Sequence, residues 1–411
     1  MGAHFHDLFV QKPNIDLPLA IVIFCLVVFG IIMISSVSVF QSYQLTSGMV
    51  TQGLLKEPSN SYYLWRHFSR ALLSMPVWIF AIYFPLNFWK KAALPLFVIT
   101  ILLLISLFVP GIGANYGTST SWIDLPLLPS LQPAELAKLG LIFYLAVWME
   151  KRQELVRSFQ YGFIPFTILL SSIVVLLAMQ PDFGSVLVIA VIAASMFFAA
   201  GGSPLHIMAG GLLAAGMAYP IIMSKEYIRN RFLTFLNPDL DPLNIGFQIK
   251  QALIAIGSGG IFGVGFGKSI QKFGYLPEVQ GDTIFAAAAE ELGFIRISFL
   301  VLAYLIIAYR GYRIAGNAVD RFSMLVATGI TSWFTFQAII NMGVNLAILP
   351  LTGLTLPFIS YGGSSLIINM LAAGILLNIS RNAETGTSFA NRRRIRRSYH
   401  PQPRRREGYQ R

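Results

Sequence analysis

The chain has 411 residues, of which 55% are hydrophobic and only 12% are charged. Its apolar runs are continuous and long enough to cross a bilayer, which takes about 20 mostly apolar residues per helix. The runs do not alternate, so helices are favoured over a closed barrel. The formal charge of +12 does not indicate nucleic-acid binding, because ten of the thirty Lys and Arg lie from Arg381 onward. These features predict an all-α integral membrane protein.

The apolar runs predict ten transmembrane helices, and the first of them, which no cleavage pattern follows, acts as its own insertion signal. The single Cys25 excludes a disulfide within the chain, and no His or Cys cluster has metal-ligand spacing. The predicted spans are 17–40, 66–85, 92–110, 133–150, 161–179, 184–200, 204–223, 283–309, 321–346 and 355–380.

The positions of Lys and Arg predict the orientation. Loops on the side of the termini carry basic residues, whereas the opposite loops 111–132, 180–183 and 347–354 carry none. Both termini are therefore expected in the cytoplasm. The long loop 224–282, between the seventh and eighth spans, is expected outside.

Three parts of the chain follow from this arrangement. We expect a cytoplasmic segment 1–16, a membrane domain 17–381 and a basic cytoplasmic tail 382–411. The tail contains RRRIRR and RRR but few large apolar residues, so it is expected to be disordered and attracted to anionic membrane lipids.

Four acids gather between Tyr275 and Gly293, in the stretch YLPEVQGDTIFAAAAEELG. Ionisable groups beside an apolar helix are costly and indicate a functional site. For Asp282 two interpretations stay open: a catalytic acid, or a helix N-cap whose pKa the helix dipole would lower. Capping would leave Glu278 unexplained.

Two further motifs have structural alternatives. Glu135 and Lys138 share a face of the fourth span, as a self-neutralising structural pair or as substrate contacts. The glycines of SGGIFGVGFG (258–267) indicate a loop that bends back against the membrane, because Phe262 stands where a phosphate-binding loop requires glycine.

Four motifs together resemble the bacterial SEDS family of shape, elongation, division and sporulation proteins. They are QPAELAKL (132–139), RFLTFLNPDLDPLNIGFQ (231–248), LPEVQGDTIFAAAAEELG (276–293) and NMGVNLAILPLTGLTLPFISYGGSS (341–365). The last motif resembles the division branch, FtsW, more than the elongation branch, RodA. The chain departs from the family's usual residues at Leu351 and Thr352, at Ser121 before Trp122, and at the neighbours of Asp282: Gln280, Gly281 and Thr283.

The resemblance implies a peptidoglycan glycosyltransferase that polymerises lipid II at the outer face of the cytoplasmic (inner) membrane, at the division septum. It further implies a class B penicillin-binding protein and other divisome proteins as partners. We expect Asp282 to be the base for an inverting transfer from a lipid diphosphate. Candidate substrate contacts are Glu278, Arg70, Arg229, Arg231, Gln248, Lys250, Lys268, Lys272, Ser360, Tyr361, Gly362 and Gly363.

Glu278 could instead help Asp282 hold a divalent cation such as magnesium or manganese, since hard cations prefer carboxylate oxygen. The alternative functions are a lipid II flippase, a polymerase of elongation and a division scaffold without chemistry. The concentration of acids beside one outer loop, rather than deep in several spans, favours the enzyme over a transporter.

Overall fold

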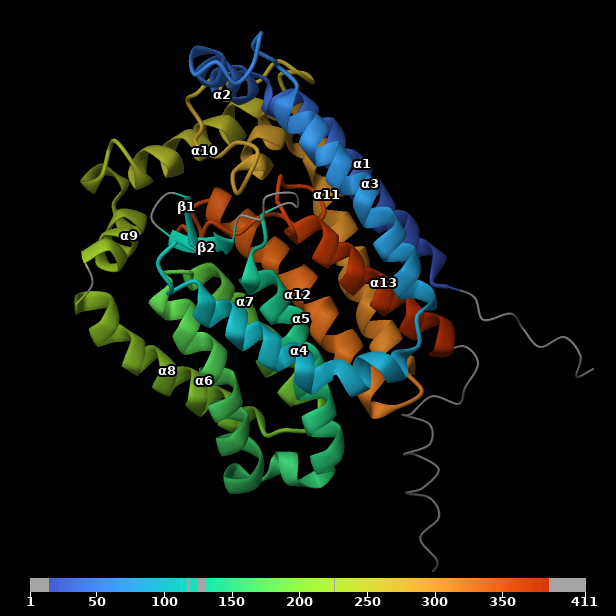
Figure 1. Cartoon of the computed structure of the whole chain (residues 1–411). Helices are drawn as coiled ribbons and strands as arrows, with labels where there is room; N and C mark the ends of the chain where they lie inside the picture. Colours follow the sequence, from blue (N-terminus) through green and yellow to red (C-terminus); the bar gives the residue numbers. More distant parts are fainter. Residues whose placement is uncertain (1–14, 112, 117–118, 124–129, 225, 384–411) are drawn as a thin grey trace, which may run out of the picture.

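The computed structural model describes residues 15–111, 113–116, 119–123, 130–224 and 226–383, which form a bundle of helices with one short hairpin (Figure 1). The basic tail after Ala383 and the first fourteen residues lie outside the described part. The helices that coincide with the predicted spans are α1 (Leu17–Val37), α3 (Tyr62–Tyr83), α4 (Leu86–Ser106), α5 (Pro133–Arg152), α6 (Ile164–Met179), α7 (Phe183–Ala199), α8 (Pro204–Ser224), α11 (Ile284–Asn317), α12 (Arg321–Asn345) and α13 (Ser365–Ala383).

Length and composition mark the chain as an integral membrane protein. Within the described residues, six segments are long and apolar enough to cross a bilayer: α1, α4, Phe159–Met179, α11, α12 and α13. Helix α7 and the first part of α8, Pro204–Gly216, are apolar but shorter. The all-helical membrane class is therefore confirmed, while the count of ten spans stays a prediction.

The last predicted span begins ten residues too early. Residues 355–364 do not form helix, and α13 starts at Ser365. The backbone of this segment is paired elsewhere: Tyr361 N donates to the carbonyl of Gln280 (2.8 Å). Apolar composition alone does not distinguish a helical turn from a buried loop whose polar groups have tertiary partners.

The predicted outer loop has its own structure. It contains α9 (Glu226–Leu236), a 3-10 turn (Pro238–Leu240) and α10 (Ile245–Gly259). The chain bends after α10, as its glycines predict, and the bend packs against α11. Gly263 has φ +80°, and a Cβ there would meet the carbonyl oxygen of Glu291 at 2.3 Å. Only glycine permits this approach of the loop to α11, which is itself kinked at Gly293 (φ 76°).

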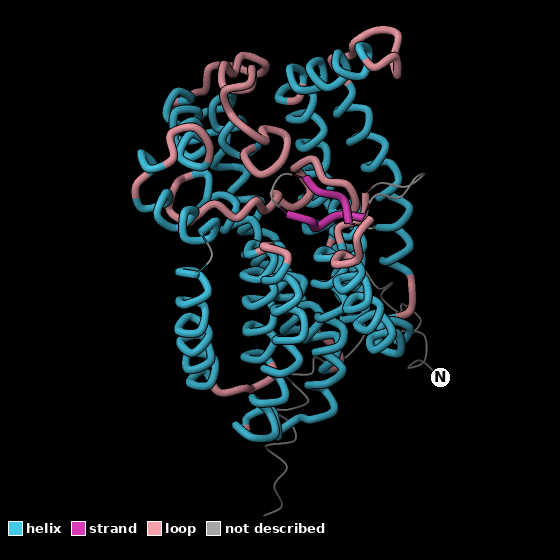
Figure 2. The backbone as a smooth tube through the Cα atoms, turned by 60° about the vertical axis from the view of Figure 1, so that its left-hand side comes forward, coloured by secondary structure: helices cyan, strands magenta, loops and turns pink. Residues whose placement is uncertain are grey.

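Another connection, expected only as a loop, forms a hairpin of β1 (Gly113–Tyr116) and β2 (Ser119–Ile123), paired antiparallel with Gly113 opposite Ile123. A further bridge joins Ile123 to Leu131, and Gln132 N donates to the hydroxyl of Ser364 (2.9 Å). In Figure 2 the hairpin and the longer loops lie toward the upper part of the bundle. The end of the connection between the hairpin and α5 thus contacts the segment that precedes α13.

The antiparallel helices α1 and α13 show which end of the bundle holds the chain termini. At one end, Asp16 N donates to the hydroxyl of Ser380 (3.1 Å), and Arg310 forms an ion pair with Asp16 (2.8 Å). At the other end of α1, the Ser36 hydroxyl donates to Glu291 near the start of α11 (2.6 Å). The ends of α1 and α13 nearest the chain termini therefore meet opposite the turn that carries Asp282.

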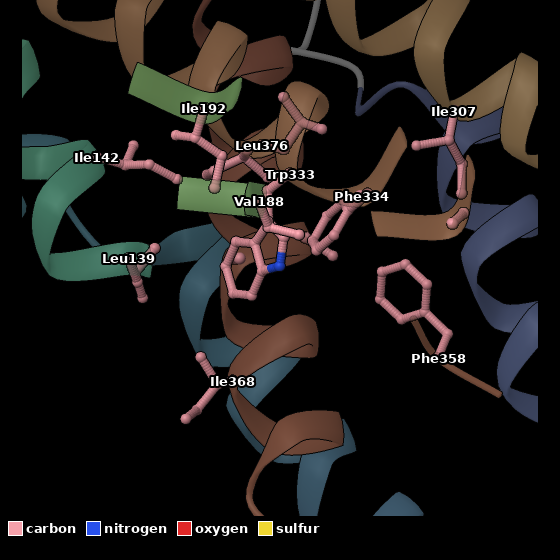
Figure 3. Packing of buried hydrophobic residues seen from close by; sticks show 14 of the residues in the cluster. Leu139, Ile142, Val188, Ile192, Ile307, Trp333, Phe334, Phe358, Ile368 and Leu376 are labelled. Carbon is pink, nitrogen blue, oxygen red and sulfur yellow. The ribbon is translucent and has the colours of Figure 1, made fainter. Parts of the chain in front are cut away.

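The core is centred on α12, whose residues are buried on nearly every side between α5, α7, α11 and α13 (Figures 1 and 3). Trp333 and Phe334 are fully buried, and the Phe334 ring packs edge-on against Phe358, with centroids 4.9 Å apart. The same helix buries the amide side chains of Gln337, Asn341 and Asn345. Such groups need hydrogen-bond partners inside the protein.

Candidate active site

Asp282 lies in the turn just before α11, outside the membrane-spanning segments, and it does not cap the helix. The N-cap residue is Thr283, whose side chain makes no capping bond and donates instead to the Pro277 carbonyl (2.6 Å). The Asp282 carboxylate accepts one long hydrogen bond, from Gln248 Nε2 (3.4 Å). The N-cap interpretation was therefore wrong, and Gln248 is brought to the acid as expected.

The expected lowering of the Asp282 pKa was also wrong. Burial is the largest effect, and together with the negative charge of Glu278 it raises the pKa of Asp282 from 3.8 to about 7. Hydrogen bonds and the charge of Arg231 oppose this rise in pKa only in part. The carboxyl group is thus suited to exchange a proton near neutral pH.

Glu278 stands beside Asp282 in a strained turn. Its backbone has φ +49°, which is unusual for a residue with a side chain, and its carbonyl accepts from Gly281 N (2.7 Å). The side chain reaches the surface, yet crowding by neighbouring protein raises the pKa of its carboxyl group. Backbone strain of this kind clusters at functional sites.

Residues of α3 and of the segment before α13 lie on another side of the Asp282 turn. Arg70 is buried, its guanidinium lies 4.4 Å from the centroid of the Tyr361 ring, and its Nη1 donates to the Gly362 carbonyl (3.4 Å). The Ser360 hydroxyl donates to the Gly281 carbonyl (2.7 Å). Four of the sequence-predicted contacts, Arg70, Ser360, Tyr361 and Gly362, therefore gather around the turn of Asp282.

Gly363, in the same segment before α13, has a packing role. A Cβ at that position would meet the carbonyl oxygen of Ser130 at 2.5 Å, so the backbone approaches the end of the hairpin connection too closely for any side chain.

The predicted cations of the outer loop separate into three groups. Arg231 acts electrostatically on Asp282. Arg229 and Lys268 are exposed, and no hydrogen bond or ion pair of the described residues links them to the acid. Lys250 forms an exposed ion pair with Asp239.

Lys272 does not fit its predicted role. It is buried, and its Nζ contacts the carboxylate of Glu291 (3.0 Å), the hydroxyl of Ser36 (3.0 Å) and the carbonyl of Gly267 (2.7 Å). Its charge is already compensated inside the protein, so we remove it from the candidates for diphosphate binding. No sequence pattern predicts this pairing, because Glu291 lies 19 residues from Lys272 on a different element and Ser36 lies 236 residues away.

Glu135 and Lys138 form the pair that their spacing predicts. Lys138 Nζ lies 2.5 Å from Glu135 Oε1, and both side chains are almost fully buried. Lys138 also donates to Gln337 Oε1 (2.8 Å) and lies over the Trp333 ring. Gln337 in turn donates to the Thr355 carbonyl (2.9 Å), so the pair supports the segment that carries Ser360.

Sequence reasoning missed Arg66 and Tyr63. The charges of Arg66 and Glu278 both act on the Tyr63 hydroxyl, and the Tyr63 ring packs edge-on against Tyr361 with centroids 5.0 Å apart. Arg66 is exposed at the start of α3. Its spacing of four residues from Arg70, which places both on one helix face, was the available signal.

Glu278 and Asp282 are the two carboxylates that the described residues bring together as a candidate metal site. Within the described part of the chain, no group of three or more His, Cys, Asp and Glu side chains could hold a metal ion. However, Asp282 Oδ1 is buried and accepts no hydrogen bond from those residues. Glu278 and Asp282 therefore fit a cation only if a ligand supplies further oxygens.

Fold and site together define a polytopic membrane protein with an acidic centre at the end of the bundle opposite the chain termini. A model of the cell cycle proteins FtsW, RodA and SpoVE matches residues 17–385, and the chain belongs to this family. The matched region nearly coincides with the membrane domain predicted at 17–381.

Curated relatives match along almost their whole length. The probable peptidoglycan glycosyltransferase FtsW of Geobacter sulfurreducens is 39% identical over 365 residues, covering 89% of this chain and 95% of that protein. Stage V sporulation protein E of Bacillus subtilis is 38% identical over 376 residues, covering 90% and 98%.

Solved structures share the fold. A chain of a peptidoglycan synthase complex, studied for its coordination of polymerization and crosslinking, has a TM-score of 0.73 and 27% identity, covering 90% of this chain and 98% of that one. The rod shape determining protein RodA of Thermus thermophilus has a TM-score of 0.65 and 26% identity with the same coverage.

Proposed function

We propose that the chain is a peptidoglycan glycosyltransferase that polymerises lipid II into glycan strands during cell division. The names of its relatives support the activity, and their FtsW assignment favours division over elongation. The observation that carries the proposal is Asp282, an acid with a pKa raised to about 7 and held at the end of the bundle opposite the termini.

In the proposed reaction, the 4-hydroxyl of one sugar attacks C1 of another from the face opposite the diphosphate. The Asp282 carboxylate takes the hydroxyl proton as the new C–O bond forms, and the bond from C1 to the diphosphate oxygen breaks. A base with a pKa near the working pH combines a useful ionised fraction with a strong drive for proton transfer. The raised pKa therefore suits this role better than the lowered pKa expected for a cap.

Undecaprenyl diphosphate leaves with negative charge, which needs cations near the site. We assign this role to Arg70 and Arg231 and add Arg66, which lies on the same face of α3 as Arg70. Guanidinium groups suit phosphate because they donate paired hydrogen bonds in a fixed geometry. Arg229 and Lys268 stay as candidates at the rim.

A divalent cation, magnesium or manganese, is a further part of the proposal. Glu278 and Asp282 would hold it together with diphosphate oxygens, and it would supply positive charge to the leaving group. Polymerisation that survives exhaustive chelation would remove the cation from the proposal. The assignment of Asp282 as the base does not depend on it.

The proposed orientation places the termini in the cytoplasm and Asp282 outside, at the division septum, where the head group of lipid II is exposed. The synthase complex among the solved structures supports a class B penicillin-binding protein as the partner that cross-links the strands. Other divisome proteins are proposed as partners on the resemblance alone.

Purified protein given labelled lipid II tests the proposal. The parent should make glycan strands, and Asp282→Asn should lose about 10²- to 10⁴-fold in rate, the usual contribution of a general base. The substitution should leave insertion and partner binding unchanged, because Asp282 caps no helix and its buried charge is itself unfavourable. Glu278→Gln should show a smaller defect.

Other outcomes would point to the alternative functions. Translocation of lipid II without polymer would indicate a flippase, and neither activity would indicate a scaffold. Near-parental polymerisation by Asp282→Asn would refute Asp282 as the base and direct the search to Glu278.

A further inference from the structure

Three successive main-chain carbonyls of the Asp282 turn are held by side chains or backbone from other parts of the fold. The Gln280 carbonyl accepts from Tyr361 N (2.8 Å), and the Gly281 carbonyl accepts from the Ser360 hydroxyl (2.7 Å). The Asp282 carbonyl accepts from both Asn341 Nδ2 (2.8 Å) and Asn345 Nδ2 (2.9 Å). The residue that carries the acid thus has the most donors of the three.

Both asparagines come from one face of the most buried helix. They lie four residues apart at the end of α12, where side chains at this spacing are neighbours. Asn341 also donates to the Leu354 carbonyl (2.7 Å), and Asn345 also donates to the Asn341 carbonyl (2.9 Å). The asparagines therefore join α12, the segment before α13 and the Asp282 turn at a single point.

Both amides are oriented toward main-chain carbonyls, and each donates two hydrogen bonds to them. Both Oδ1 atoms are buried, yet neither accepts a hydrogen bond from the described residues. Here each amide is turned so that its donor faces a main-chain carbonyl, which is the orientation that fixes the Asp282 turn.

We propose that Asn341 and Asn345 are positioning residues for the transfer reaction, which hold the Asp282 main chain so that its carboxylate points at the attacking hydroxyl. This inference rests on the proposed function of Asp282. Among the described residues, the carboxylate accepts a hydrogen bond only from Gln248, at 3.4 Å, so the direction of the carboxylate depends strongly on where the backbone is held. A displacement of about 1 Å in a reacting group can cost about a hundredfold in rate.

The test replaces Asn345 by leucine, which has the same branching and the same number of side-chain heavy atoms but lacks the amide donor. Asn341 still donates a hydrogen bond to the Asp282 carbonyl, so the variant should fold with a nearly unchanged melting temperature. The kcat for strand formation should fall about 10- to 100-fold, with KM for lipid II within about threefold of the parent. A loss of packing alone would not separate kcat from KM in this way.

Asn378→Leu is the matched control. Asn378 is equally buried on α13, and its amide likewise donates to two main-chain carbonyls, those of Ala81 (3.0 Å) and Phe84. It lies at the opposite end of the bundle, near Ser380. This variant should lose at least as much stability as Asn345→Leu and keep a near-parental kcat.

Asn345→Leu with a near-parental kcat, or an equal loss of kcat in Asn378→Leu, would overturn the inference. Asp282→Asn, measured in parallel, distinguishes failure of this inference from failure of the proposed function. An active Asp282→Asn variant would refute Asp282 as the base. An inactive Asp282→Asn variant together with a fully active Asn345→Leu variant would refute only the positioning role. If Asn345→Leu does not insert into the membrane, Asn345→Ser, which is smaller and lacks the amide donor, replaces it. The same fall in kcat with a nearly unchanged KM is expected for that variant.

Discussion

At the scale of single residues, the raised pKa of Asp282 predicts how the rate depends on pH. The protonated acid cannot accept a proton, so the rate should rise about tenfold per pH unit below the pKa and level off above about 7. Since the charge of Glu278 contributes to the rise in pKa, Glu278→Gln should move the midpoint to lower pH. Initial rates of strand formation between pH 5 and pH 9 provide the measurement, and a flat profile would contradict the assignment.

The same pKa fixes the sign of a stability effect. The pKa of Asp282 in the folded protein, about 7, lies above its ordinary value of 3.8, so folding favours the protonated form. That contribution to stability is complete below about pH 4 and is lost as the pH rises to about 7. The melting temperature of Asp282→Asn, relative to that of the parent, should therefore increase between about pH 4 and pH 7. Above about pH 7 the difference should stay constant.

Glu135 and Lys138 give a second prediction at this scale. Both are almost fully buried, so removing one partner leaves an uncompensated ion and should cost roughly 3 to 5 kcal/mol. A charge swap should recover part of this loss, because the attraction survives exchange of the two signs. A double-mutant cycle on thermal stability measures the coupling, and purely additive losses would refute it.

At the scale of elements, the predicted outer loop is attached to the membrane helices by a buried polar cluster. Lys272 pairs with Glu291 of α11 and with Ser36 of α1, while Glu290 accepts from the Ser269 hydroxyl and from Ile270 N (3.0 Å). These contacts fix the chain between the glycine bend and the Asp282 turn. They also explain two acids, Glu290 and Glu291, that the sequence grouped with the functional site.

Breaking this attachment should release the loop. Lys272→Met leaves Glu291 buried without its partner, so hydrogen exchange across 265–275 should accelerate and stability should fall by roughly 3 to 5 kcal/mol. The double variant Lys272→Met/Glu291→Leu should regain most of the loss. The control is Lys250→Met in the same loop, whose exposed pair with Asp239 should matter little. Equal effects of Lys272→Met and Lys250→Met would contradict this role.

At the scale of the whole molecule, the two ends of the bundle predict opposite accessibility. Leu243 is 84% exposed in the outer loop, and Asn317 is exposed at the far end of α11. With Cys25 replaced by serine, a cysteine at 243 should react with an impermeant maleimide in spheroplasts, and one at 317 should react only after lysis. Thr234, in the same outer loop, is a poor labelling site because it is buried. Labelling of position 317 alone before lysis would reverse the orientation.

The sequence by itself determined the all-helical membrane class, the approximate positions of most helices and the glycine bend, but it placed the start of the last helix ten residues too early. Apolar run length, charge spacing and glycine content act locally, so they can be interpreted from the chain alone. Glu135 and Lys138 were paired correctly for this reason, since three residues of helix bring them together.

Only the tertiary structure decided which polar groups satisfy one another. Lys272 was expected to contact a diphosphate but pairs with Glu291. For Asp282 the sequence left a helix cap and a catalytic acid open, and the structure shows it buried beside Glu278. The Asn341 and Asn345 donors reach a carbonyl about sixty residues away, as their separations of 59 and 63 show. Burial and long-range hydrogen bonds set both the pKa of Asp282 and the direction of its carboxylate, and neither depends on local sequence.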